Sequence, residues 1–322
     1  MRDIKAISTF SGCGGSSTGY KAAGITMAAC IEWDAHAVEC YGLNHPSTRI
    51  FHGDIAKVSG AALMEAAGVD VGELDILDGS PPCQGFSIVG RRIFDDPRNA
   101  LFREQLRLID EIQPRTVVLE NVAGMIKGKM RLVAAEIVRE LKSRGYEVAA
   151  GLMEAQYFGV AQLRPRVFFI GSKVGAPSLP RPSSRPISCG VALRGIAPDE
   201  VIIPGNPGER LMATHLHPGE NGPDVMRRIG RKDGWFNVSM LHPKKLSPTI
   251  VKQSRGPRGC TLFHWERRHV SIREALVLTG FPPDYILPGS FSERWARIGN
   301  SVAPPMTREI ARQVLIPLLR KV

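Results

Sequence analysis

The sequence predicts an α/β protein made of a sheet-based domain and a smaller, irregular basic domain. Up to about residue 173, short apolar segments alternate with helical segments, the pattern of a mostly parallel sheet with helices on both faces. Several strand-like segments end in glycine, proline or acidic residues, at the edge where such sheets bind ligands. After about residue 175 this pattern fades, and proline, glycine and arginine dominate stretches such as PSLPRPSSRP.

Length and charge are consistent with this division. A chain of 322 residues can form one large core, or a core and a smaller domain. Its net charge of +11 indicates a polyanionic partner. Most of the excess lies between Arg181 and Arg273, where 16 Lys and Arg face 7 Asp and Glu, a net of +9. A basic surface that serves only solubility is the alternative.

The sequence contains no sign of export or of a metal site. The N-terminus lacks the apolar core of a signal peptide, and no apolar run approaches the roughly 18 residues of a membrane span. The six cysteines form no Cys-x-x-Cys pair. We therefore expect a cytoplasmic, monomeric protein with reduced thiols and no bound metal.

The first two strands carry the features of an adenosine-binding site. A strand at 5–10 leads through Ser11-Gly12-Cys13-Gly14-Gly15 into a helix at 16–23, a general cradle for nucleotide cofactors. The strand at 26–31 ends in Glu32-Trp33-Asp34, where an acidic residue commonly binds ribose hydroxyls. Trp33 is suited to stacking on an adenine ring, and Asp54, after a third strand, to meeting its amino group. An interface tryptophan beside a helix-capping Asp34 is the alternative.

The segment LDILDGSPPCQGFS places one cysteine in a rigid loop. A short apolar run at 74–77 is followed by a Pro-Pro turn and Cys83. Proline fixes the backbone φ angle, so Cys83 is held just past the end of a strand. A thiolate there is a candidate nucleophile, although a buried cysteine in a turn is the commoner case. The residues at 85–97 are a candidate lid.

The remaining elements complete an alternating pattern. A β-branched strand at 116–119 ends in Glu120-Asn121-Val122, and Gln162-Leu163-Arg164-Pro165-Arg166 enters another strand. Ser271 and Glu274 form a capping box for a short helix. Further helices are expected at 99–112, 130–143 and 306–319, and further strands at 146–158 and 167–170.

Taken in order, these motifs resemble those of the DNA cytosine-C5 methyltransferase family. The resemblance covers about 1–173 and 266–322 and fails between them, where that family has a variable target-recognition domain. Ser11 and Cys13 are mild variants, and Ala303 is inserted before the final proline. The resemblance implies a Rossmann-like, S-adenosylmethionine-binding catalytic domain at 1–174 plus 286–322, and a target-recognition domain at 175–285.

The family chemistry assigns roles to matching residues. Cys83 would add to C6 of a flipped-out cytosine, with Gln84 beside it. Glu120 would donate a proton to N3, Arg164 would hold the base O2, and Arg166 would steady the loop. The expected cofactor residues are Phe10, Ser11, Gly12, Cys13, Gly14, Gly15, Glu32, Trp33, Asp54, Ile55, Gly79, Pro82, Leu101, Asn300 and Val302. The expected DNA-binding residues are Ser87, Gln162, Arg227, Arg228, Lys244, Lys245, Thr249, Lys252, Arg255 and Arg258.

Two other functions remain open. A transfer RNA cytosine methyltransferase shares the Pro-Pro-Cys-Gln loop, but the Cys-Phe-Thr signature associated with that branch is absent. A catalytically inactive DNA-binding homologue is the second alternative, against which stand Cys83, Glu120 and Arg164. The expected partner is double-stranded DNA, with a cognate restriction endonuclease as a further candidate.

Overall fold

The chain forms two compact units. The computed structural model describes residues 3–82, 100–231, 235–253 and 261–321. The first unit consists of Met1–Glu154, Pro165–Pro182 and Pro304–Val322, and the second of Ala155–Arg164 and Ser183–Ala303.

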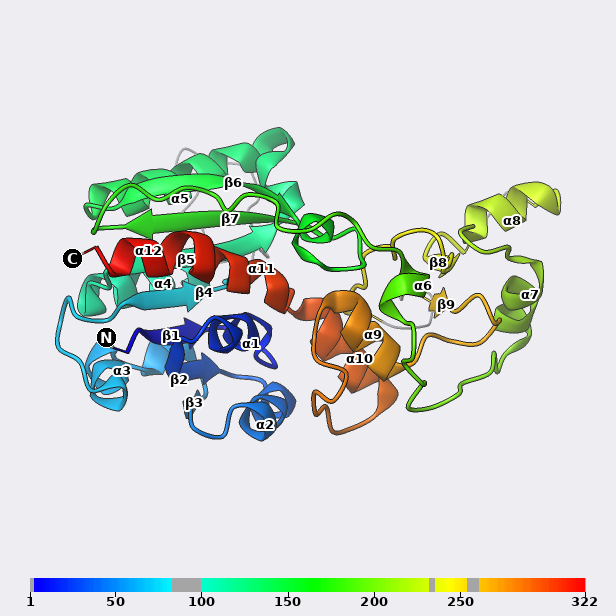
Figure 1. Cartoon of the computed structure of the whole chain (residues 1–322), viewed down its shortest axis with the longest axis horizontal. Helices are drawn as coiled ribbons and strands as arrows, with labels where there is room; N and C mark the ends of the chain where they lie inside the picture. The colour runs from blue at the N-terminus through cyan, green and yellow to red at the C-terminus, as the bar shows by residue number, and fades with distance from the viewer. Residues whose placement is uncertain (1–2, 83–99, 232–234, 254–260, 322) are drawn as a thin grey trace. The chain divides into compact units, whose positions relative to one another are not determined.

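The first unit is built on a seven-stranded sheet with the order β3-β2-β1-β4-β5-β7-β6 (Figure 1). Its strands are β1 (Lys5–Thr9), β2 (Thr26–Glu32), β3 (Arg49–His52), β4 (Ile76–Gly79), β5 (Thr116–Val122), β6 (Glu147–Glu154) and β7 (Pro165–Ser172). Neighbours from β3 to β5 are parallel, whereas β7 is antiparallel to both β5 and β6. This arrangement confirms the predicted Rossmann-like α/β fold.

Three helices cover one face of this sheet. They are α3 (Gly60–Ala67), α4 (Ala100–Ile112) and α5 (Arg131–Ser143). Leu63, Ile109 and Ile137 of these helices share a buried core with Ile7 of β1 and Val117 of β5. Burial of such side chains contributes about 1.5–3 kcal/mol each, so this face supplies much of the stability of the unit.

Helix α1 (Gly15–Ala22) packs on the opposite face together with the C-terminal segment. That segment comprises α11 (Pro304–Ile310), a π-helical turn (Ala311–Leu315) and α12 (Ile316–Leu319), and it crosses in front of β4, β5 and β7 in Figure 1. Gly19 of α1 lies so close to Thr307 and the Pro304 carbonyl that a Cβ there would collide with both. Four further helical segments connect strands along the chain. They are α2 (Ala35–Asn44), η1 (Ile55–Lys57), η4 (Ala123–Ile126) and η5 (Gly128–Met130).

The second unit consists of short helices around a two-stranded sheet. Its helices are η6 (Ala155–Phe158), α6 (Cys189–Ala192), α7 (Pro207–His215), α8 (Gly222–Arg228), α9 (Ile272–Thr279) and α10 (Phe291–Asn300), and the parallel strands are β8 (Val238–Met240) and β9 (Thr261–Phe263). A small core joins Met212, Val225, Met240 and Phe263. None of the described helices combines the length and the apolar character needed to cross a membrane.

Most elements of the first unit lie within a few residues of their predicted positions. The capping box of α9 is confirmed: Ser271 Oγ accepts from the Glu274 N–H at 3.3 Å, and Glu274 Oε2 accepts from the Ser271 N–H at 2.9 Å. The sequence pattern does not predict α3 or α10, and it indicates α2 only through the alternative that Asp34 caps a helix. It also expects little regular structure between 174 and 265, where α6, α7, α8, β8 and β9 occur.

The compact units have different bounds from the predicted domains. Residues 155–164 and 286–303, which the sequence assigns to a catalytic domain, pack with the second unit. The packing of short segments against distant ones leaves no compositional signal in the chain. The division by function into a catalytic and a recognition domain stays a prediction.

Candidate functional site

The loop between β1 and α1 is strongly bent and pinned to β2. Phe10, Gly12 and Gly14 have φ angles of 53°, 56° and 95°, a region that favours glycine. The Gly12 N–H donates to Glu32 Oε2 at 2.7 Å, and the Ser11 N–H donates to the Ile31 carbonyl at 3.2 Å. A Cβ at Gly12 would meet open space. The loop therefore presents backbone, without side-chain bulk at Gly12, next to the end of β2.

Glu32 and Trp33 occupy the end of β2. Glu32 Oε1 accepts hydrogen bonds from the N–H groups of Trp33 and Asp34, each at 2.9 Å. Trp33 is 78% exposed, so its indole presents an open aromatic face. Asp34 accepts from the Ala37 N–H at 3.0 Å and is the N-cap of α2. The capping interpretation is thus right for Asp34, while Trp33 stays available to a planar ligand.

The other predicted cofactor residues lie in varied environments. Asp54 caps η1 by accepting from the Ala56 N–H at 3.0 Å. Gly79 packs against Thr9 and Gln105, with no room for a Cβ, so packing alone explains this glycine. Ile55 is buried, Leu101 is partly exposed on α4, and Pro82 is exposed. Asn300 and Val302 belong to the second unit, and their predicted contact with the cofactor stays a prediction.

Asn121 anchors the turn that leads toward Cys83. Its Nδ2 donates to the Pro81 carbonyl at 3.0 Å, and its Oδ1 accepts from the Val122 N–H at 2.8 Å. The end of β5 therefore fixes the start of the Pro-Pro turn after β4. The sequence motif includes Asn121 but assigns it no role. Cys83, Gln84 and Ser87 lie outside the described residues.

Glu120 and Arg166 form an ion pair at the same edge. Arg166 Nε lies 2.9 Å from Glu120 Oε1, and the two side chains are 13% and 12% exposed, respectively. The sheet register explains the pairing, because Arg166 of β7 lies opposite Val122 of β5, two residues after Glu120 on the same face. Both side chains remain partly exposed, so a ligand can contact them. A carboxyl can donate a proton to such a ligand, and a guanidinium can stabilise negative charge on it.

Arg164 has different surroundings. Its side chain is fully buried, and its Nη atoms donate to the carbonyls of Ile250 at 2.8 Å and Gly299 at 2.8 Å, and also to Ser301. Gln162, also buried, accepts from Arg164 and from the Ile250 N–H and donates to Thr279. Arg164 thus holds together three segments of the second unit. The expectation that it holds a base oxygen has no support in this geometry, which favours Arg166.

Comparison with known proteins decides the family. A model of the C-5 cytosine-specific DNA methylase family matches residues 4–187 and 208–315. The chain belongs to this family. It is therefore a DNA cytosine-5 methyltransferase, and the sheet edge carrying Glu120 and Arg166 is its candidate active site.

Relatives of this methylase match it over most of their length. The Type II methyltransferase M1.HphI of Haemophilus parahaemolyticus is 30% identical over 96% of this chain and 86% of its own. M.XorII of Xanthomonas oryzae pv. oryzae is 33% identical over 98% of this chain and 85% of its own. The crystal structure of a protein encoded within an E. coli prophage has the same fold, with a TM-score of 0.75 at 23% identity over 99% of this chain and all of that one.

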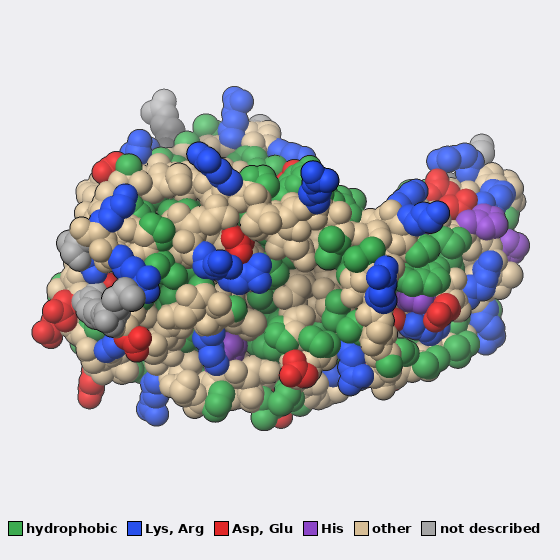
Figure 2. Space-filling model, viewed as in Figure 1, with side chains coloured by type: hydrophobic (Ala, Val, Ile, Leu, Met, Phe, Trp, Pro, Cys, Tyr) green, Lys and Arg blue, Asp and Glu red, His purple; other side chains and the backbone are tan. Residues whose placement is uncertain are grey.

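The basic segment of the methylase is partly neutralised within its own unit. Arg228 forms a two-pronged pair with Glu220, at 2.7 and 2.9 Å, and also donates to the His215 carbonyl. On the face drawn in Figure 2, Lys and Arg side chains are scattered among other types rather than merged into one patch. Arg227 is 79% exposed and lies 3.6 Å from Asp224. The basic residues of this segment therefore differ in how far their charge is available to a ligand: Arg228 is paired with Glu220, whereas Arg227 is largely exposed.

The other predicted DNA-binding residues also differ from one another. Lys244, Lys245 and Lys252 are exposed, whereas the Thr249 hydroxyl donates to the Leu163 carbonyl. Arg255 and Arg258 lie outside the described residues. The structure adds Phe236, which is 73% exposed beside Trp235, whose indole packs on Gly208. Neither of two adjacent aromatic residues carries a sequence signal that tells which is exposed and which is packed.

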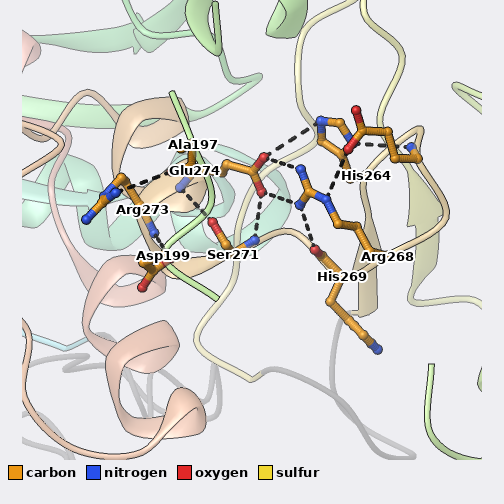
Figure 3. A network of polar contacts seen from close by, with 9 residues as sticks. Ala197, Asp199, His264, Arg268, His269, Ser271, Arg273 and Glu274 are labelled. Atoms are coloured by element: carbon orange, nitrogen blue, oxygen red, sulfur yellow. Dashed lines mark hydrogen bonds and ion pairs between the residues drawn. The ribbon is translucent and has the colours of Figure 1, made fainter. Parts of the chain in front are cut away.

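A buried network around Glu274 accounts for more of the positive charge (Figure 3). Arg268 Nη1 and Nη2 donate to the Glu274 carboxylate at 2.8 and 2.7 Å. His264 approaches the same carboxylate, with Nε2 3.7 Å from Oε1 of Glu274. Burial alone would raise the pKa of Glu274, but the hydrogen bonds from Arg268 and from the Ser271 N–H lower it. This charge stabilises the connection between β9 and α9 and is not available to a ligand.

Proposed function

We propose that this methylase transfers a methyl group from S-adenosylmethionine to C5 of a cytosine flipped out of duplex DNA, with Cys83 as nucleophile. The observation that carries the proposal is the Glu120–Arg166 pair at 2.9 Å. It lies at the end of β5, beside the Pro-Pro turn that Asn121 anchors, and Cys83 directly follows that turn in the sequence. Cytosine C5 is a poor nucleophile, and such a pair meets the charge demands of activating it.

The loop after β1 fits the proposed cofactor. Its positive φ angles and the open space at Gly12 leave backbone accessible to a ligand. Trp33 offers an aromatic face for adenine, and Oε2 of Glu32, which accepts one hydrogen bond where Oε1 accepts two, retains a lone pair for a ribose hydroxyl. When bound there, S-adenosylmethionine supplies an electrophilic methyl group.

The residues of the chain activate the base. The Cys83 thiolate forms a bond to C6 as Glu120 gives its proton to N3, so that no full negative charge develops on the ring. Arg166 holds the base O2 by a charge-assisted hydrogen bond. C5 is then electron-rich enough to accept a methyl group. A water molecule takes the C5 proton, the electrons of that C–H bond form the C5–C6 double bond and expel the thiolate from C6, and the N3 proton returns to Glu120.

The second unit is proposed to hold the DNA. Exposed Arg227, Lys244, Lys245 and Lys252 are suited to phosphates. Because the matched relatives are Type II methyltransferases, we also infer that the methylase protects DNA from a cognate restriction endonuclease.

The test is trapping on a fluorinated substrate. Bisulfite sequencing of DNA from expressing cells identifies the site, and a duplex with 5-fluorocytosine at that site is then incubated with S-adenosylmethionine. Because fluorine cannot leave as a proton does, we expect a stable covalent adduct on Cys83, found by peptide mass spectrometry.

Two variants and a second substrate complete this test. Cys83→Ser should form no adduct, whereas Cys189→Ala, at a buried thiol of the second unit, should form it as the wild type does. An adduct on another cysteine would refute the nucleophile. Methylation of transfer RNA without methylation of any duplex would refute DNA as the substrate.

A further inference from the structure

A second carboxyl lies buried at the same end of the sheet. Asp78 of β4 is 2% exposed. Ser8 Oγ donates to its Oδ2, and Tyr20 Oη to its Oδ1, each at 3.0 Å. Burying a carboxyl is unfavourable unless it is hydrogen-bonded, and an apolar residue would fill a central strand at lower cost. None of the roles described so far explains this residue.

The register places Asp78 and Glu120 on one face of the sheet. Asp78 lies opposite Ser8 of β1 and Val118 of β5. Glu120 follows Val118 by two residues, so its side chain points to the same side as that of Asp78. With parallel strands about 4.8 Å apart and a rise of about 3.3 Å per residue, such diagonal neighbours are about 8 Å apart. Arg166 lies on the same face beyond Glu120, because it is opposite Val122, two residues further along β5.

Glu120 is therefore flanked by charges of opposite sign. Arg166 favours its carboxylate form, which cannot donate a proton. The pKa of Asp78 is raised to about 6, chiefly by burial and to a smaller extent by the charge of Glu120, while hydrogen bonds from Ser16, Tyr20 and Ser8 lower it. Asp78 is thus mostly ionised above neutral pH, and its negative charge favours the protonated form of Glu120.

We propose that Asp78 is a positioning residue that keeps Glu120 in its proton-donating form beside Arg166. This inference rests on the proposed role of Glu120. Around Asp78 the described structure provides Ser8 on β1, Ser16 and Tyr20 on α1, and Glu120 on β5 as the interacting groups. Without the charge of Asp78, Arg166 would dominate, and Glu120 would lose its proton at lower pH.

The experiment is a pH profile of single-turnover methylation for the wild type and Asp78→Asn. We expect the loss of rate at high pH to begin about one pH unit lower in the variant, the size of a charge interaction over this distance in a medium of intermediate dielectric. Asp75→Asn is the matched control. Asp75 is equally buried on the same chain segment but accepts from the Lys5 N–H and pairs with Arg115, so its loss should leave the profile in place.

An unchanged high-pH limb in folded Asp78→Asn would overturn the inference, as would an equal shift in Asp75→Asn. The proposed acid fails separately if Glu120→Gln keeps the wild-type rate. Should Asp78→Asn not fold, carbon-13 NMR of the carboxyls in the wild type decides the matter. Mutually dependent two-step titrations of Asp78 and Glu120 are expected, and independent one-step titrations would overturn the inference.

Discussion

Two regions of the molecule bury charged side chains, and they differ in what those charges contact. At the sheet edge, Glu120 and Arg166 contact each other and keep 12% and 13% of their side-chain surface exposed. In the second unit, Arg164 is fully buried against backbone carbonyls, and Arg268 lies against Glu274 with both side chains below 10% exposed. The Glu120–Arg166 pair is thus accessible to a ligand, whereas Arg164, Arg268 and Glu274 are enclosed by protein.

The difference separates reactive charge from structural charge. A buried guanidinium whose Nη donors are directed to carbonyls stabilises the fold but has little left for a substrate. A carboxyl–guanidinium pair at the rim can exchange one partner for a ligand. The sequence motif contains both Arg164 and Arg166, but their surroundings differ. Substitution of Arg164 is expected to lower stability, and substitution of Arg166 to lower activity.

The largest expected effect is on turnover at the sheet edge. Glu120→Gln keeps the shape and a hydrogen bond to Arg166 but removes the acid, so methylation should slow by about 10²–10⁴-fold. The free energy of unfolding should change by about 1 kcal/mol or less. Single-turnover rates and urea titrations measure both, with exposed Glu147→Gln as the control. A rate near that of the wild type would exclude Glu120 as the acid.

The next effect is on stability in the enclosed region. Arg164→Met would leave the carbonyls of Ile250, Gly299 and Ser301 buried without their donor, which should lower the free energy of unfolding by about 3–5 kcal/mol. Leu163→Ala, at a half-exposed neighbour, should change it far less. If folded Arg164→Met lost base binding without losing stability, Arg164 would belong with the reactive charges.

The smallest effect distinguishes two adjacent arginines of α8. Arg227→Gln removes an exposed charge and should reduce the slope of log affinity against log salt by about one unit. Arg228→Gln removes a charge already paired with Glu220 and should change the slope less. Binding of a duplex over a salt series measures both. Equal slopes for the wild type and Arg227→Gln would mean that this part of α8 does not contact phosphates.

The fold of the first unit could be predicted because its signals are local. Apolar runs mark its strands. One helix of the second unit, α9, has an equally local signal, because the two hydrogen bonds between Ser271 and Glu274 that mark its start lie within four residues. In the second unit, Pro207 and Pro223 indicate breaks, yet both lie in the first turn of a helix, where no N–H is required. Asn206 and Asn221 cap these helices, a signal that the surrounding prolines and glycines obscured.

The sequence proposed residues for the candidate site, but it could not indicate their interaction partners. Glu120 and Arg166 stand 46 positions apart, and only the antiparallel register of β5 and β7 brings them together. Asp78 interrupts an apolar strand, but its approach to Ser8 and Tyr20 requires the sheet and α1 to be in place. The pairing of Arg228 with Glu220 likewise depends on a loop whose shape the sequence does not specify.

The way in which the chain alternates between the two units determines how specificity could be transplanted. Residues 155–164 belong to the second unit although the first resumes at Pro165. A graft that exchanged only 175–285 with a relative would bring in a foreign partner for Arg164 at position 250 while keeping the native ones at 299 and 301. Junctions at 154/155, 164/165, 182/183 and 303/304 would instead move Gln162, Arg164 and all their partners as one cassette.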